Sequence, residues 1–134
     1  MLPNKGLHAY RSTEVTSRTP LELVVMLYDG AIRFVGAARE AIGRGDIRAR
    51  SQAISRALAI VSELQNTLDI ERGGEMAESL DDLYRYLTQR LVQATVSNDV
   101  SALDEARRLL ETLRDGWHTI AAQAASAAPI GARR

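Results

Sequence analysis

The chain has 134 residues, no net charge, no cysteine and 46% hydrophobic residues. This length suffices for one domain with a single core, and the apolar content argues against a disordered chain. The neutral charge balance argues against a dedicated nucleic-acid-binding protein, and the lack of cysteine excludes disulfides, thiolate nucleophiles and cysteine-bound zinc.

The N-terminal part of the chain predicts an arm followed by a helix. Residues 1–18 show no sustained apolar period, so we expect an arm that is mobile or loosely docked. A Thr-Pro-Leu-Glu capping box at 19–22 then marks a helix start, with proline at the first helical position. Apolar residues at steps of three and four predict that this helix covers residues 20–42.

Three more helices follow, joined by short loops. Their expected ranges are 46–69, 75–97 and 100–125, with a loop at the double glycine of 71–74 and a flexible tail at 126–134. Their expected core-facing positions are Ile47, Ile54, Val61 and Leu68; Met76, Leu80, Leu83, Leu87, Leu91 and Ala94; and Leu103, Ala106, Leu110, Leu113, Trp117, Ile120 and Ala124. The sequence therefore predicts an all-α domain, an antiparallel up-down-up-down four-helix bundle.

The first helix carries more apolar residues than one buried stripe needs. Leu21, Val25 and Ile32 lie outside its main stripe, and Tyr84 and Val92 lie beside the stripe of the third helix. A helix that is apolar nearly all round needs cover on most sides. Other helices of the bundle would provide this cover for most of these residues, and the remainder would suit a groove that binds a partner helix.

Enzymatic alternatives find little support in the sequence. A carboxylate-bridged metal site in a bundle needs a Glu-x-x-His motif on two helices, whereas only Asp115 and His118 have this spacing and His8 lies in the arm. The acidic residues Glu75, Glu78, Asp81 and Asp82 are typical of the first turns of a helix. We therefore expect no catalysis, metal or cofactor. A metal-dependent bundle enzyme and a purely structural oligomer, in which the first helix buries its surplus against a second copy, stay as alternatives.

The sequence predicts a cytoplasmic localisation. No stretch of the chain is long and apolar enough to predict membrane insertion. The N-terminus also lacks the apolar core of a secretory signal.

Four segments carry motifs in a fixed order. Residues 19–32 read Thr-Pro-Leu-Glu-Leu-Val-Val-Met-Leu-Tyr-Asp-Gly-Ala-Ile, and residues 45–47 read Gly-Asp-Ile. Residues 83–99 read Leu-Tyr-Arg-Tyr-Leu-Thr-Gln-Arg-Leu-Val-Gln-Ala-Thr-Val-Ser-Asn-Asp, and residues 113–117 read Leu-Arg-Asp-Gly-Trp. These segments, in this order and at these distances, resemble the signatures of the flagellar export chaperones of the FliS family.

The resemblance implies a non-enzymatic function. Members of this family are cytoplasmic four-helix bundles, monomeric or dimeric, that bind the C-terminal segment of flagellin, which is disordered when free. Binding prevents premature polymerisation and presents flagellin to the gate of the flagellar type III export apparatus, and the family also contacts regulators of flagellar assembly. No nucleic acid or membrane insertion is implied.

One set of candidate site residues is implied by the family resemblance, and another follows from the apolar pattern of the helices. A Gly-Leu-His-Ala-Tyr segment at 6–10 resembles the family's gate-docking segment, which implies export-gate contacts for Leu7 and Tyr10. The apolar pattern of the first and third helices provides the candidates for a client-binding groove, and some of them can equally be core. These candidates are Leu21, Val25, Tyr28, Ile32, Tyr84, Leu87 and Leu91.

Overall fold

The computed structural model describes residues 19–127, with side chains to residue 126, and contains four helices. They are α2 (Pro20–Arg44), α3 (Ile47–Asn66), α4 (Ile70–Ser97) and α5 (Val100–Ala127). No strand occurs in this part of the chain, so the predicted all-α class is confirmed. The predicted arm, with Leu7 and Tyr10, lies outside the described residues, as does most of the predicted tail.

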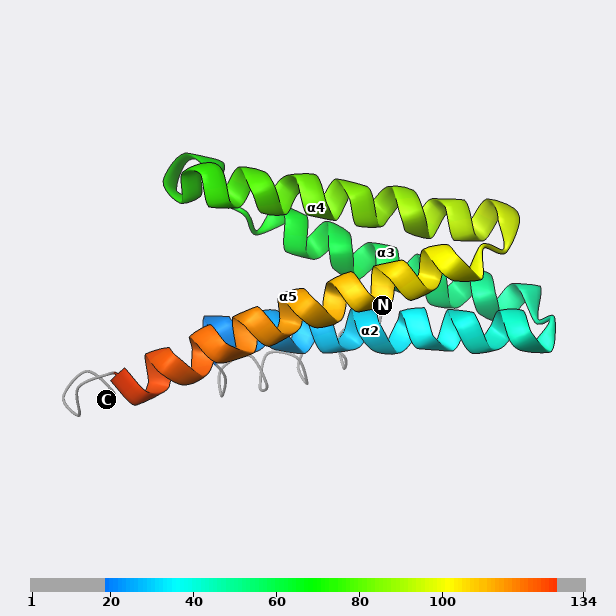
Figure 1. Ribbon diagram of the computed structural model, residues 1–134, viewed down its shortest axis with the longest axis horizontal. Coiled ribbons are helices and arrows are strands. Elements are labelled where there is room, and N and C mark those ends of the chain that lie inside the picture. Colours follow the sequence, from blue (N-terminus) through cyan, green and yellow to red (C-terminus); the bar gives the residue numbers. More distant parts are fainter. Residues whose placement is uncertain (1–18, 128–134) are drawn as a thin grey trace, which may run out of the picture.

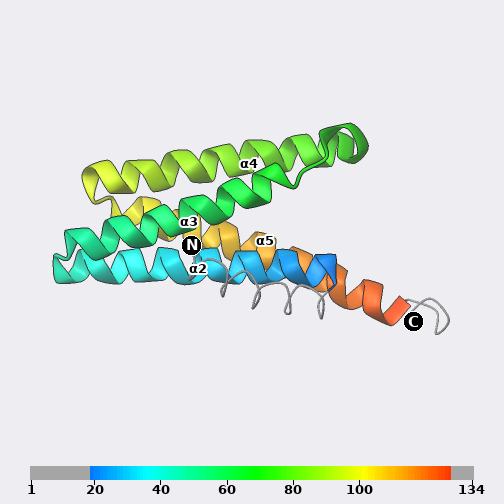
Figure 2. The same cartoon turned by 180° about the vertical axis from the view of Figure 1, so that it is seen from behind.

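The helices run alternately in opposite directions along one axis (Figures 1 and 2). The main packing contacts join α2 to α3 and α5, and α4 to α3 and α5, so α2 and α4 lie diagonally across a ring of four. This arrangement confirms the four-helix bundle. No helix within residues 20–127 is long and apolar enough to cross a membrane.

Local sequence determines where α2 begins and ends. The Thr19 hydroxyl accepts a hydrogen bond from the Glu22 amide at 3.1 Å, and the Glu22 carboxylate accepts one from the Thr19 amide at 2.9 Å. This is the predicted capping box, which pairs two amide groups that the first turn leaves without helical partners. At the other end Gly45 adopts φ 71°, a left-handed conformation that glycine reaches without steric cost.

The start of α4 differs from the predicted loop at 71–74. The chain is already helical at Ile70, because the Asp69 carboxylate caps the first turn by accepting from the Arg72 amide at 3.2 Å. The helix is then broken at Gly74, whose φ of 57° and ψ of −135° lie outside the helical region. The double glycine therefore marks a kink within α4, not a loop before it.

A single apolar core runs between the four helices. Its largest fully buried side chains are Tyr28, Tyr84, Ile54, Leu64, Leu87, Leu91, Leu103, Leu110, Val35 and Val61. Four expected core-facing residues differ from this pattern, because Met76 is 69% exposed, Ile47 is 64% exposed, and Ile120 and Ala124 are also exposed. Each of them lies near a helix end, where fewer neighbouring side chains are available to cover it.

Most polar links between helices lie toward the end of the bundle that holds two interhelical turns. These turns, at 45–46 and 98–99, appear together at the right of Figure 1. Near them the Arg50 guanidinium on α3 donates to the side-chain oxygen of Asn98. The polar pairs that tie α5 to α2 and α4 there are Arg39 Nε–Asp104 Oδ1 at 2.6 Å and Arg90 Nε–Glu105 Oε1 at 2.6 Å.

Candidate functional site

A cavity of about 440 Å³ lies at the opposite end of the bundle. The ribbons of α4 and α5 diverge toward this end, where α4 begins (Figure 1). Side chains from all four helices line the cavity, which opens to the surface. The lining residues are Pro20, Leu21, Val24, Leu64, Thr67, Leu68, Asp69, Arg72, Gly73, Met76, Ala77, Leu80, Tyr84 and Trp117.

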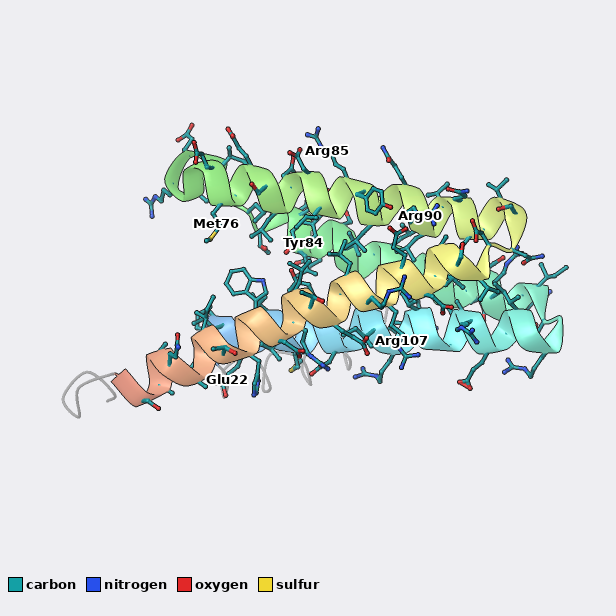
Figure 3. The ribbon with its side chains drawn as sticks, viewed as in Figure 1. Glu22, Met76, Tyr84, Arg85, Arg90 and Arg107 are labelled. Carbon is teal, nitrogen blue, oxygen red and sulfur yellow. The ribbon has the colours of Figure 1, made fainter. Side chains whose placement is uncertain are left out.

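The cavity wall is predominantly apolar. Ten of the fourteen lining residues are apolar or aromatic. Four of these, Val24, Leu68, Leu80 and Trp117, are only partly covered by the rest of the bundle, whereas Leu64 is fully buried. Met76 and Tyr84 project from α4 toward the side on which α2 and α5 lie (Figure 3). Because the methionine side chain is unbranched and polarizable, Met76 can adapt to apolar groups of different shapes. Such a cavity is suited to binding apolar side chains of a partner.

A pair of tyrosine hydroxyls adjoins this apolar wall. The hydroxyl oxygens of Tyr28 on α2 and Tyr84 on α4 lie 2.5 Å apart and share one hydrogen bond. Burial raises the pKa of Tyr28, an effect that hydrogen bonds with Tyr84 and Trp117 partly offset. Burial and the hydrogen bond with Tyr28 also raise the pKa of Tyr84. Both tyrosines therefore stay neutral at physiological pH, and their bond links the two diagonal helices.

Comparison with known proteins identifies the family. The family model for "Flagellar protein FliS" matches residues 3–124 of the chain. The chain belongs to the FliS family. The flagellar secretion chaperone FliS of Salmonella typhimurium is 36% identical over 129 residues, which cover 92% of this chain and 96% of that protein. The flagellar secretion chaperone FliSB of Pseudomonas aeruginosa is 40% identical over 107 residues, covering 80% and 85% of the two chains.

A third FliS relative has a similar identity and coverage. The flagellar secretion chaperone FliS of Bacillus subtilis is 36% identical to this chain, and the match covers 81% of this chain and 80% of that protein. The resemblance that the four sequence motifs indicated is therefore confirmed over most of the chain.

The FliS-like motif at 19–32 has an identifiable structural role. Tyr28 supplies one hydroxyl of the buried pair, and the Asp29 carboxylate accepts a hydrogen bond from the Arg114 guanidinium on α5 at 3.2 Å. A Cβ atom at Gly30 would lie 3.1 Å from the Ile60 side chain of α3, so glycine permits α2 and α3 to pack closely there. The motif thus links α2 to each of the other three helices.

The structure divides the seven predicted groove residues into two groups. Leu21 and Val25 are half-buried, and Leu21 lines the cavity. The other five belong to the buried core, namely Tyr28, Ile32, Tyr84, Leu87 and Leu91. Of these five, Tyr84 also borders the cavity. Contact of the seven residues with a client stays a prediction, and the burial of the five means that they are covered by other helices in this arrangement.

Sequence reasoning missed several residues of the cavity wall. The apolar periods predict core-facing positions for Leu68, Met76, Leu80 and Trp117, but they do not indicate a cavity there. The double glycine at 73–74 signalled a break in the chain, but not that α4 diverges from α5 at this point. Because the cavity depends on how far the helices diverge, an apolar period alone does not reveal it.

The pair Asp115 and His118, considered as half of a metal site, has a different environment. The Asp115 carboxylate forms an ion pair with Arg114 at 3.0 Å, and the His118 side chain is exposed. Within the described part of the chain, no group of three or more histidine, aspartate or glutamate side chains could hold a metal ion. In the acidic cluster, Asp81 accepts a hydrogen bond from Gln65 and pairs with Arg85, which are structural interactions.

Proposed function

We propose that this protein is a cytoplasmic export chaperone without catalytic activity. It binds the disordered C-terminal segment of flagellin, prevents premature polymerisation and delivers the bound subunit to the flagellar type III export gate. Membership of the FliS family and the printed function of its relatives, flagellar secretion chaperones, support this role. The observation that carries the proposal is the open apolar cavity to which all four helices contribute.

The cavity offers the apolar surface that such a client needs to bury on binding. A disordered segment loses conformational entropy when it folds on binding, so it must bury apolar surface in compensation. The half-buried Leu21 and the largely exposed Met76 flank the cavity and gain cover when a client occupies it. Covering these side chains removes apolar area from water, which is the main favourable term in such binding.

The proposal is tested by calorimetric titration with a peptide of about 40 residues from the C-terminus of flagellin of the same organism. We expect one-to-one binding with favourable enthalpy, opposing entropy and a negative heat-capacity change, as in other cases of coupled folding and binding. Met76→Asp places a charge in the apolar cavity mouth and is expected to weaken binding about tenfold or more. Its thermal stability should change little, because Met76 is 69% exposed.

Val96→Asp is the matched control for this titration. Val96 lies on the same helix, is 81% exposed and is separated from Met76 by 20 residues, about 30 Å of helix. We expect its affinity for the peptide to equal that of the unchanged protein. If Val96→Asp and Met76→Asp weaken binding equally, the cavity is not the client site. If the unchanged protein does not bind the peptide at high micromolar concentration, flagellin is not its client.

Contact with the export gate is proposed for Leu7 and Tyr10. A Leu7→Ala/Tyr10→Ala variant is expected to bind the flagellin peptide normally, but to co-purify less gate component than the unchanged protein. Unchanged recovery of the gate component would rule out this role for the two residues.

A further inference from the structure

Only one of the two hydroxyl protons of the buried Tyr28–Tyr84 pair takes part in the hydrogen bond between them. Two hydroxyls joined by one hydrogen bond employ one O–H group as donor, and the O–H of the accepting tyrosine still needs an acceptor. Among the residues that the structure describes, neither the Tyr28 nor the Tyr84 hydroxyl has a second acceptor. Trp117 does not resolve this surplus, because its indole N–H, which interacts with Tyr28, can only donate.

Either hydroxyl can carry the surplus proton, and that of Tyr84 belongs to a residue that lines the cavity. Tyr84 and Trp117 are both lining residues, whereas the rest of the wall around them is largely aliphatic. Tyr28 and Tyr84 are 0% and 2% exposed, so bulk water does not surround the pair. A buried donor without an acceptor is unfavourable, and a purely hydrocarbon occupant of the cavity would leave it in that state.

We propose that the Tyr28–Tyr84 pair determines which client segments the cavity accepts. The favoured segment inserts apolar side chains and brings one oxygen acceptor, a main-chain carbonyl or a side-chain amide or hydroxyl oxygen, to the remaining tyrosine proton. This inference rests on the proposed function, and it adds a polar requirement to an otherwise apolar site. Sites that pair a buried polar group with a ligand discriminate more strongly than sites that only match apolar shape.

The test compares tyrosine-to-phenylalanine variants in the titration with the flagellin peptide. The Tyr28→Phe/Tyr84→Phe variant keeps both rings and removes both hydroxyls. We expect it to bind about tenfold more weakly, the effect of one lost hydrogen bond to a buried client oxygen. Tyr86→Phe is the matched control, since the Tyr86 hydroxyl donates to Glu105 at 2.6 Å and Tyr86 is not a lining residue. Its affinity should equal that of the unchanged protein.

Thermal unfolding of the variants separates this role from a purely structural one. Tyr28→Phe alone leaves the Tyr84 hydroxyl buried without its partner, so its Tm should fall below that of the double variant, in which no hydroxyl remains to be satisfied. The single variant still offers a donor to the client, so its affinity should exceed that of the double variant. The order of stability is thus expected to be the reverse of the order of affinity.

The outcomes distinguish this inference from the proposed function. If the double variant binds the peptide as tightly as the unchanged protein while Met76→Asp weakens binding, the hydroxyl pair does not select the client and the chaperone function stands. If affinity follows stability across the phenylalanine variants, the pair is only structural and the inference fails. If the unchanged protein does not bind the peptide, the proposed function and this inference fail together.

Discussion

Replacing Leu91 with alanine is expected to lower the free energy of unfolding by about 2–5 kcal/mol. Leu91 is fully buried at the centre of the core, and truncation would remove its apolar contacts and leave a void. Because domains of this size are stable by only about 5–15 kcal/mol, this loss is a large part of the total. Urea denaturation followed by circular dichroism measures it as a lower midpoint with an unchanged slope.

Val96→Ala is the matched control, because it shortens an apolar side chain on the same helix at an 81% exposed position. We expect a change of less than about 0.5 kcal/mol. The comparison also bears on the predicted groove, to which Leu91 was assigned from the sequence. A Leu91→Ala protein that keeps its stability but loses the flagellin peptide would place Leu91 in the client site, contrary to its burial.

Replacing Gly74 with valine is expected to lower the free energy of unfolding by about 1–3 kcal/mol. The φ of 57° and ψ of −135° at Gly74 are accessible to glycine, but strongly unfavourable for a β-branched side chain. The kink also positions the first turn of α4, which supplies Arg72 and Gly73 to the cavity wall. We therefore expect weaker binding of the flagellin peptide as well, measured by the same titration.

Gly116→Ala is the control for the effect of removing a glycine. Gly116 lies within α5, and a Cβ atom there would meet no other atom within 4 Å. Alanine should therefore stabilise the protein by roughly 0.5–1 kcal/mol through its better helix propensity. If Gly74→Val proves as stable as the unchanged protein, the kink does not depend on glycine.

Much of the fold could be predicted because the signals are local. The capping box at 19–22 depends on residues three positions apart, and the structure shows both of its hydrogen bonds. The apolar periods indicated four helices in the same way. The kink at Gly74 was harder to predict from the sequence. Two adjacent glycines indicate a break in a helix, but not whether the helix resumes at the next residue.

The site was harder to predict because it depends on tertiary packing. The apolar period shows that Leu87 and Met76 share a face of the same helix, but not how closely the neighbouring helices approach each of them. Leu87 is fully buried, whereas Met76 is largely exposed where α4 diverges from α5. The tyrosine pair joins residues 56 positions apart on diagonal helices, a proximity that no local pattern encodes.

The polar links between α4 and α5 are distributed unevenly along the bundle. Two of the three turns between antiparallel helices, and the pairs Arg39–Asp104 and Arg90–Glu105, hold the helices together toward one end. Toward the other end, the hydrogen bonds Gln65–Asp81, Tyr28–Tyr84 and Asp29–Arg114 join α3 to α4, α2 to α4 and α2 to α5. The hydrogen bonds from Tyr86 and Arg90 on α4 to Glu105 on α5 lie nearer the first end. A change in the spacing of α4 and α5 beside the cavity would therefore leave the hydrogen bonds of Glu105 in place.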